Sequence, residues 1–321
     1  MTFRRGLASA AALAVLLSAG SVFAAEETIA VFTKNQTNPF FEVLRVGAQK
    51  AAQALGAKII NYIPTQPDSI PEQLSEIDDV IVKKPDAILL IPVDYKAMVP
   101  GIQRINAAKI PIVNLTDRSA GGDFVAFVGA DDYGIAQATA ERLLQEIGGK
   151  GKVIILEGVR GSLTASDRLR GFQDALKKFP GVKLVASQPG NYQRLVAMQV
   201  MENLLQRNPD VNGVLAANDA MAIGALDALN EADAKALVVG INGTKEAVDA
   251  IKSGKLLATG DYNGFLQGCI ATTIAIRSLR GEPVPKDVTL KPIVIDRTNY
   301  EPYDVAVKDR TCPAWDQEAA Q

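Results

Sequence analysis

The sequence contains no histidine and only two cysteines, Cys269 and Cys312, in 321 residues. Zinc sites in proteins are built mainly from histidine and cysteine ligands, and hydrolase triads commonly need a histidine as general base. The chain therefore cannot form ordinary zinc sites or histidine-dependent triads, which excludes many hydrolase mechanisms. We expect a binding protein that is not an enzyme and has no metal site and no cofactor.

Blocks of basic residues are also missing, and the formal net charge of the full chain is -2. Nucleic-acid-binding domains usually carry clustered positive charge, so this composition disfavours a nucleic acid as partner. No G-x-G-x-x-G follows a predicted strand, and the GGKGK string at 148–152 lacks the P-loop spacing. Enzymes that use a dinucleotide or a nucleotide are disfavoured for this reason, although strand-helix alternation alone also fits a Rossmann domain.

Long apolar runs are absent apart from one at 7–17, which follows two arginines. This run is shorter than the about 20 residues that a membrane-spanning helix needs. It precedes a stretch of mostly small residues, an arrangement typical of a secretory signal peptide. We predict a signal peptide at 1–24, cleaved after Ala24 or, as second choice, Ala25, and an exported, soluble, periplasmic mature chain.

Short β-branched runs alternate with amphipathic stretches along nearly the whole mature chain, a pattern typical of parallel sheets covered by helices. The predicted strands span 28–33, 58–63, 87–91, 110–115, 125–128, 153–156, 183–187, 213–216, 236–241, 257–260 and 290–295. One predicted helix face carries Phe41, Leu44, Ala48, Ala51 and Leu55. Because more than ten strands are too many for one comfortable open sheet, we predict an α/β fold with two Rossmann-like lobes.

No linker rich in proline, glycine or serine divides the chain, so we expect three strand-like hinge segments between the lobes, near Ala130, Tyr262 and Leu290. The predicted N-terminal lobe comprises residues 25–130 and 263–289, and the predicted C-terminal lobe comprises residues 131–262 and 290–321.

Polar and aromatic side chains follow many of the predicted strands. They are Lys34, Asn38, Phe40, Phe41, Asp94, Asp117, Arg118, Asn218, Asp219, Asn242, Asp261 and Tyr262. Open parallel sheets bind ligands beyond the carboxyl ends of their strands, where these residues meet. Asp, Asn and Arg can each engage two neighbouring hydroxyl groups, and aromatic rings such as that of Tyr192 can stack on C–H faces. The set predicts a crevice for a sugar or polyol.

Several of these residues also have purely structural explanations. Asn218 or Asp219 could cap the following helix, with Asp219 the better candidate. Phe41 begins the apolar helix face and fits core packing as well as stacking, whereas Phe40 lies off that face. Arg118 could form an ordinary surface ion pair, a contact that contributes little to stability.

Five strings in order along the chain carry a family resemblance. They are NPFF at 38–41, TDR at 116–118, SDRLRGF at 166–172, AANDAMAIGAL at 216–226 and VGINGT at 239–244. Over residues 27–296 the chain resembles the periplasmic sugar-binding proteins of the ribose-binding type, which have the type I periplasmic binding fold. The resemblance implies the solute-binding component of an ABC importer, which closes two lobes around its ligand and presents the closed form to a membrane permease.

The resemblance also implies roles for individual residues. Asn38, Phe40 and Phe41 match contacts of the N-terminal lobe, with the rings opposing Tyr192 of the other lobe. Asp117 and Arg118 match a hydroxyl clamp, and Arg168 and Asn218 match hydrogen-bonding positions of the C-terminal lobe.

Two positions depart from the ribose pattern, because Asn242 replaces an Asp and Tyr262 replaces a Gln. Losing a carboxylate weakens charge-assisted bonds to paired hydroxyls, and a bulky tyrosine reshapes the pocket. We therefore expect a different pentose or a small linear polyol, bound by a monomer. The alternative is the effector domain of a LacI-type transcription regulator, which would need a DNA-binding segment where the signal peptide lies.

The two cysteines admit two interpretations. An oxidising compartment favours a disulfide between Cys269 and Cys312, which the C-terminal tail could form by folding back. Cys269 could equally be an unpaired residue in the core of an apolar helix.

Overall fold

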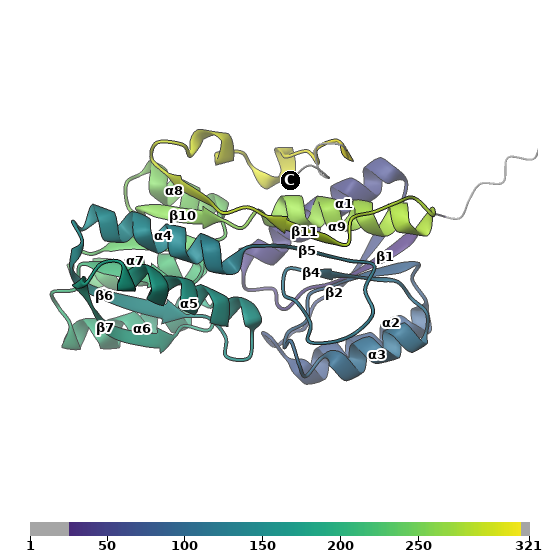
Figure 1. Cartoon of the computed structure of the whole chain (residues 1–321), viewed down its shortest axis with the longest axis horizontal. Coiled ribbons are helices and arrows are strands. Elements are labelled where there is room, and N and C mark those ends of the chain that lie inside the picture. Colours follow the sequence, from purple (N-terminus) through teal and green to yellow (C-terminus); the bar gives the residue numbers. More distant parts are fainter. Residues whose placement is uncertain (1–25, 316–321) are drawn as a thin grey trace, which may run out of the picture.

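The computed structural model describes residues 26–315, so the predicted signal peptide lies outside the described residues. Two lobes lie side by side, each with a central six-stranded sheet and helices on both faces (Figure 1). This architecture confirms the predicted α/β fold with two sheets. Between residues 26 and 315, none of the helices combines the length and apolar character that crossing a bilayer requires.

The first sheet is wholly parallel. In sheet order its strands are β2 (Lys58–Tyr62), β1 (Thr28–Phe32), β3 (Ala87–Leu90), β4 (Ile112–Leu115), β5 (Ala126–Ala130) and β11 (Asp287–Leu290). Its helices are α1 (Pro39–Leu55), α2 (Ile70–Lys83), α3 (Val99–Ala107) and α9 (Gly264–Leu279). The pair α1 and α9 covers one face, and the pair α2 and α3 covers the other (Figure 1).

The second sheet repeats this plan with one reversed edge strand. In sheet order its strands are β7 (Gly181–Pro189), β6 (Lys150–Glu157), β8 (Gly213–Ala216), β9 (Leu237–Ile241), β10 (Ala258–Asp261) and β12 (Ile293–Asp296). Its helices are α4 (Asp132–Glu146), α5 (Leu163–Lys177), α6 (Arg194–Arg207), α7 (Asp219–Glu231) and α8 (Lys245–Lys252). Only β12 among the paired strands runs antiparallel to its neighbour, β10.

The chain passes between the sheets after β5, after β10 and between β11 and β12. The sequence predicted a single strand over 290–295, whereas the structure has two short strands that belong to different sheets. Pro292 lies between them and has no N–H to donate to a ladder. The break at this residue turns one predicted strand into an inter-lobe hinge.

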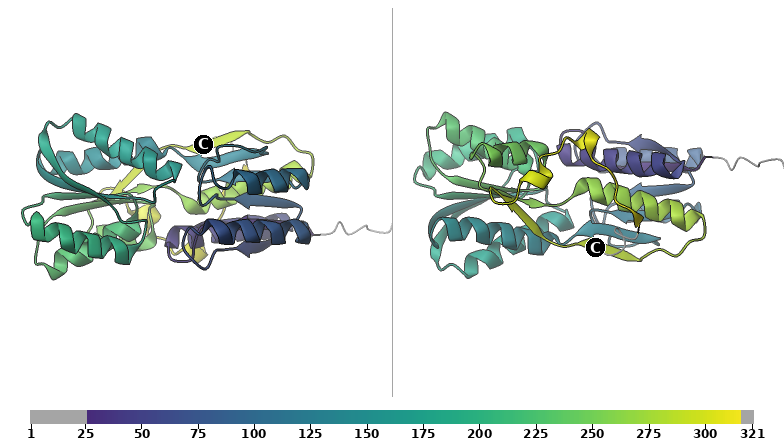
Figure 2. Two further views of the ribbon diagram at one scale, coloured as in Figure 1. Left: turned by 90° about the horizontal axis from the view of Figure 1, so that it is seen from below. Right: turned by 90° about the horizontal axis from the view of Figure 1, so that it is seen from above.

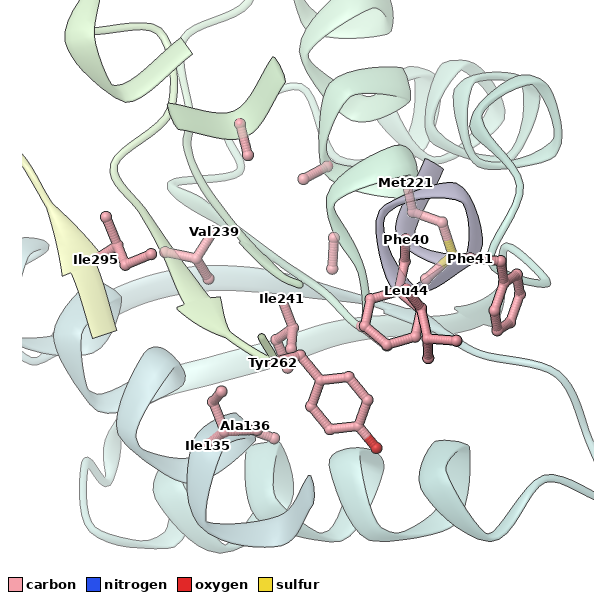
Figure 3. Close-up of a cluster of buried hydrophobic side chains, with 14 of the residues drawn as sticks. Phe40, Phe41, Leu44, Ile135, Ala136, Met221, Val239, Ile241, Tyr262 and Ile295 are labelled. Carbon is pink, nitrogen blue, oxygen red and sulfur yellow. The ribbon is translucent and has the colours of Figure 1, made fainter. Parts of the chain in front are cut away.

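Close helix packing fixes the first lobe around α1 and α9. A Cβ atom at Gly47 would lie 2.1 Å from the carbonyl oxygen of Phe265, and one at Gly268 would lie 2.1 Å from that of Leu44. Glycine at both positions therefore lets the two backbones approach. Phe40, Phe41 and Leu44 of α1 extend toward Met221 of α7 and Tyr262, so apolar packing continues from one lobe into the other (Figure 3).

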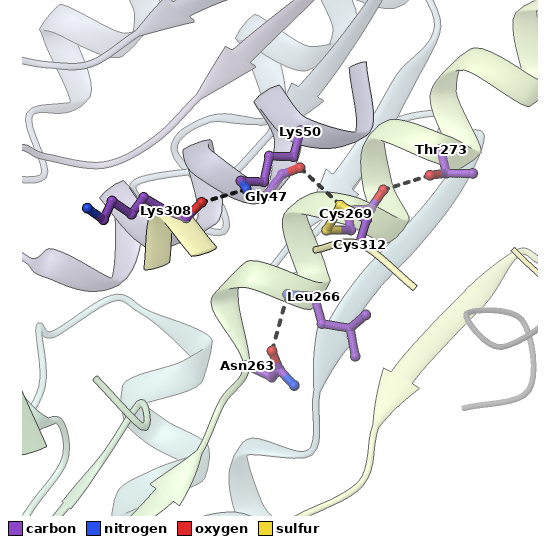
Figure 4. Close-up of a disulfide and its surroundings, with 8 residues drawn as sticks. All are labelled: Gly47, Lys50, Asn263, Leu266, Cys269, Thr273, Lys308 and Cys312. Atoms are coloured by element: carbon purple, nitrogen blue, oxygen red, sulfur yellow. Dashed lines mark hydrogen bonds between the residues drawn. A yellow bond between two sulfur atoms is a disulfide. The ribbon is translucent and has the colours of Figure 1, made fainter. Parts of the chain in front are cut away.

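The C-terminal tail after β12 joins the two lobes on the outside. It contains two 3-10 turns, Glu301–Tyr303 and Val307–Asp309, and lies beside α1 and α9 in the view from above (Figure 2). Cys312 forms a disulfide with Cys269 of α9, and its Sγ lies 3.5 Å from the carbonyl oxygen of Gly47 (Figure 4). Although the sequence assigned 290–321 to the C-terminal lobe, the end of the tail contacts helices of the first lobe.

Candidate functional site

A cavity of about 30 Å³ lies between the lobes, where the carboxyl ends of both sheets meet. This volume is far below the roughly 300–1,000 Å³ of small-molecule sites and is about the space of one water molecule, so the two lobes are nearly closed on each other. Its lining residues come from both lobes: Lys34, Asn35, Asn38, Phe40, Phe41, Asp68, Thr116, Asp117, Thr164, Arg168, Tyr192, Asn218, Asn242 and Tyr262. Ten of the fourteen residues named from the sequence for the crevice are therefore brought together.

The N-terminus of α1 supplies the apolar wall of the cavity. Asn38 caps this helix by accepting a hydrogen bond from the backbone N–H of Phe40 at 3.1 Å, and Pro39 fits the first helical position. The capped turn directs Phe40 and Phe41 to the cavity, and both rings are at least 94% buried. The ring centroid of Phe40 lies 5.3 Å from that of Tyr262. Phe41 therefore packs in the hydrophobic core and also lines the cavity.

Asp117 forms a charged contact from the first lobe to the second. One carboxylate oxygen accepts from the Lys34 ammonium, and the other accepts from the backbone N–H of Thr164 at 3.2 Å. Burial by itself raises the pKa of Asp117, but the positive charge of Lys34 and the hydrogen bonds from Lys34 and Thr164 outweigh it. The pKa is lowered, and Asp117 stays ionised in the closed cleft.

Arg168 of α5 is the central cation of the second lobe, with 2% of its surface exposed. Its Nε donates to Asp132 at 2.8 Å and its Nη1 donates to the carbonyl oxygen of Ala217 at 2.6 Å. The guanidinium also lies over the Tyr262 ring, 4.4 Å from its centroid. These contacts hold the planar guanidinium in one orientation at the cavity wall.

Asp132 connects the hinge to this network, and the sequence interpretation missed it. Its carboxylate accepts from Arg168, from the Tyr262 hydroxyl at 2.8 Å and from the Thr164 hydroxyl at 3.0 Å. Burial raises the pKa of Asp132 to about 6, and the nearby Arg168 charge opposes this rise only in part. Tyr262 is thus hydrogen-bonded to a buried carboxylate.

Asn218 lies at the N-terminus of α7 and has two structural contacts. Its Oδ1 accepts from the backbone N–H of Met221 at 2.9 Å, and its Nδ2 donates to the carbonyl oxygen of Tyr192 at 3.2 Å. The expectation that Asp219 would be the better cap is wrong. Asp219 instead accepts from Thr244 and Thr259 inside the lobe. Asn242 lines the cavity beside Arg168.

Four residues proposed from the sequence do not line the cavity: Asp94, Arg118, Asp219 and Asp261. Asp94 accepts hydrogen bonds from the backbone N–H groups of Lys96 and Ala97 in its own loop. Arg118 pairs with Asp287 at 2.6 Å and lies over the ring of Phe127, 3.6 Å from its centroid.

The backbone explains why Asp117 and Arg118 separate. Thr116 has a φ of 64°, in the left-handed region that non-glycine residues seldom adopt. Asp117 lines the cavity, whereas the side chain of the next residue, Arg118, is about half exposed and pairs with Asp287 of β11. The surface ion pair considered for Arg118 is present, but its partner is Asp287 and not Asp117.

Four further lining residues were missed: Asn35, Asp68, Thr116 and Thr164. Asp68 follows β2, Thr116 follows β4 and Thr164 follows β6, so the same rule of polar residues beyond a strand end could have found them. Burial raises the pKa of Asp68, and the charge of Lys34 opposes the rise.

Comparisons with known proteins agree with this geometry. Residues 29–283 match the family described as periplasmic binding protein domain. The ribose import binding protein of Haemophilus influenzae is 35% identical over 281 residues, which cover 87% of this chain and 94% of that protein.

Two solved structures are similar over nearly their whole length. A periplasmic solute-binding protein from Actinobacillus succinogenes with bound D-allose superposes with a TM-score of 0.82 at 33% identity, covering 87% of this chain and 100% of that chain. A solute-binding protein from Mycobacterium smegmatis with bound glycerol has a TM-score of 0.81 at 30% identity, covering 90% of this chain and 99% of that one.

Proposed function

The chain belongs to the periplasmic binding protein domain family, and we propose that it binds one small neutral sugar or polyol in the inter-lobe cavity for an ABC importer. The observation that carries this proposal is a cavity lined from both lobes by hydrogen-bonding side chains and aromatic rings. The relatives reported above are a ribose import binding protein and solute-binding proteins with bound D-allose or glycerol, and they favour this function over a transcription regulator or a nucleotide-dependent enzyme.

The charges at the cavity favour a neutral ligand. Lys34 is paired with Asp117, and Arg168 is paired with Asp132, so neither cation is left to bind an acidic group. The amide side chains of Asn38 and Asn242 add neutral donors and acceptors. Asn242 and Tyr262 stand where the ribose pattern has Asp and Gln, and on this basis we propose a pentose other than ribose or a small linear polyol.

Lobe closure is the proposed mechanism of binding. Thr164 of the second lobe donates to Asp117 of the first, and Tyr262 in the second hinge segment donates to Asp132. A ligand between these residues touches both lobes only when the lobes are close. Its preference for that form shifts the open-closed equilibrium, and no covalent step is involved.

Delivery to a membrane permease follows from this function. We propose that a monomer is exported to the periplasm by the predicted signal peptide and presents its closed form to the permease. In support, a relative that covers most of this chain is named an import binding protein.

Titration calorimetry with a panel of pentoses, hexoses and linear polyols tests the binding function. We expect at least one compound to bind with one-to-one stoichiometry and to raise the unfolding temperature. If no member of the panel binds or stabilises the protein, while ATP or NAD does, the proposed function is wrong.

A further inference from the structure

The hydroxyl of Tyr192, a residue that lines the cavity, has no hydrogen-bond partner among residues 26–315. Its oxygen is almost completely shielded by protein atoms. In native proteins the large majority of buried polar side-chain atoms are paired, and an exception calls for an explanation. Because Tyr192 lines the cavity, a bound ligand is a partner that could pair with this hydroxyl.

The local backbone holds Tyr192 in an unfavourable conformation. Asn191 and Tyr192 have φ angles of 53° and 59°, and two consecutive non-glycine residues in this region are energetically costly. The hydrogen bond from Asn218 to the carbonyl oxygen of Tyr192, at 3.2 Å, helps to fix this turn. Strain of this kind is concentrated at functional sites.

Gly158 provides the space that the ring occupies. A Cβ atom at this position would lie 2.2 Å from Cζ and 2.5 Å from Oη of Tyr192. Any side chain at 158 would therefore displace the end of the ring that bears the hydroxyl. The guanidinium of Arg168 lies 5.8 Å from the ring centroid and limits its position from another side.

The hydroxyl of the other tyrosine at the cavity, Tyr262, has hydrogen-bond partners within the protein and differs in this from the hydroxyl of Tyr192. The Tyr262 hydroxyl donates to Asp132 at 2.8 Å and lies 3.4 Å from the carbonyl oxygen of Thr116. Tyr192 has no such contact, although both phenols line the same cavity. Burial raises the pKa of Tyr192, so its phenol keeps the proton and can donate.

We propose that the Tyr192 hydroxyl hydrogen-bonds one hydroxyl of the bound sugar or polyol and rejects analogues that lack it. This inference rests on the proposed function and assigns a specificity-determining atom within it. The physical reason is that an analogue without that hydroxyl leaves the buried phenol unpaired in the closed cleft. A site that only stacks an aromatic ring on the ligand would discriminate little between the ligand and the analogue that lacks this hydroxyl.

The test compares Y192F with wild type and with Y133F. Tyr133 donates to Asp174 at 3.1 Å outside the cavity, so Y133F controls for loss of a tyrosine hydroxyl. The probes are the tightest-binding compound of the sugar and polyol panel and each of its monodeoxy analogues. We expect Y192F to bind the parent compound about five- to twenty-fold more weakly, and Y133F to bind it as wild type does.

One monodeoxy analogue should bind wild type and Y192F equally, because it lacks the hydroxyl that Tyr192 contacts. The ligand-free unfolding temperature of Y192F should equal or exceed that of wild type, since no protein hydrogen bond is lost.

Three results would overturn the inference: unchanged affinity of Y192F for the parent compound, the same loss for every analogue, or a lower unfolding temperature of ligand-free Y192F. Failure of wild type to bind any compound of the panel would contradict the proposed function instead.

Discussion

The two lobes are connected in two regions, one beside the cavity and one along the C-terminal tail, and the contacts in the two regions differ in kind. On the cavity side, Asp117 of the first lobe accepts from Thr164 of the second, and Asp132 accepts from Tyr262 of a hinge segment. Asp132 also pairs with Arg168 within the second lobe, and all these groups are largely shielded from water. On the tail side, exposed ion pairs and one disulfide make the connection (Figures 2 and 4).

The tail contacts each lobe at separate points. Asp304 pairs with Lys245 and Lys252 of α8 in the second lobe. The carbonyl oxygen of Lys308 accepts from Lys50 of α1 in the first lobe, near the disulfide. The comparison teaches that breaking a buried ion pair beside the cavity should lower both affinity and stability, whereas changes on the tail side should alter stability alone.

Replacing Arg168 should produce the largest effect. R168M leaves Asp132 buried without its cation, a change that typically costs about 3–5 kcal/mol of stability. It also removes a guanidinium from the cavity wall, so we expect affinity for the ligand to fall by about a hundredfold or more. Calorimetry and urea denaturation measure the two effects.

The double variant D132N/R168M separates these effects. It removes the unpaired charge, so it should recover much of the unfolding free energy lost in R168M without recovering ligand affinity. Full recovery of affinity would show that Arg168 acts only as a structural partner of Asp132.

Removing the disulfide should have the next largest effect. Cys269 and Cys312 are 43 residues apart, and closing a loop of this size stabilises a protein by about 2–4 kcal/mol. C269A/C312A should lose about this much free energy of unfolding. Its ligand affinity should stay within about twofold of wild type, because neither cysteine lines the cavity. A tenfold loss of affinity would contradict the division between the two sides.

Lowering the pH from 7 to 5 should stabilise the folded protein through one aspartate beside the cavity and one that faces the tail. Burial raises the pKa of Asp132 and of Asp261 to about 6, and Asp261 faces Arg310 of the tail. In the unfolded chain an aspartate has a pKa of about 3.9. Between pH 7 and 5 the folded state therefore binds more protons than the unfolded state, and the free energy of unfolding rises as the pH falls.

The variants D132N and D261N should each make this pH dependence shallower, by at most about 1.4 kcal/mol per pH unit. Urea midpoints at pH 7 and pH 5 provide the measurement. A wild-type protein that loses stability steadily over this interval would show that neither pKa is raised.

The exposed ion pairs of the tail should matter least. Asp304 is the partner of Lys245 and Lys252, and surface pairs of this kind contribute about 0–1 kcal/mol. D304N should therefore shift the unfolding free energy by less than about 1 kcal/mol, and less in high salt than in low salt. A larger loss that persists in 1 M salt would assign Asp304 a role beyond charge pairing.

The sequence predicted the fold well because strand and helix periodicities are local. All predicted strands up to 257–260 correspond to strands of the structure. The prediction of one strand over 290–295 is wrong, because the hydrophobic pattern does not reveal that the residues before and after Pro292 pair with different sheets. That information depends on tertiary pairing with β5 and β10.

The candidate site was predicted in part for a related reason. A polar residue beyond a strand end can be found in the sequence, but the direction of its side chain depends on the turn. Asp117 and Arg118 are adjacent, and the left-handed backbone at Thr116 precedes one residue in the cavity and one at the surface. Asp132 was not predicted as a site residue, because the segment after the predicted strand at 125–128 was interpreted only as a hinge between the lobes.

Hydrogen exchange of the backbone amides, with and without the tightest-binding sugar or polyol, tests the central claim most directly. Lobe closure around one ligand predicts added protection in both lobes at once, at 33–41 in the first and at 162–168 and 190–194 in the second, with the tail at 301–312 unchanged. Protection confined to one lobe, or strongest in the tail, would contradict a ligand held between the lobes.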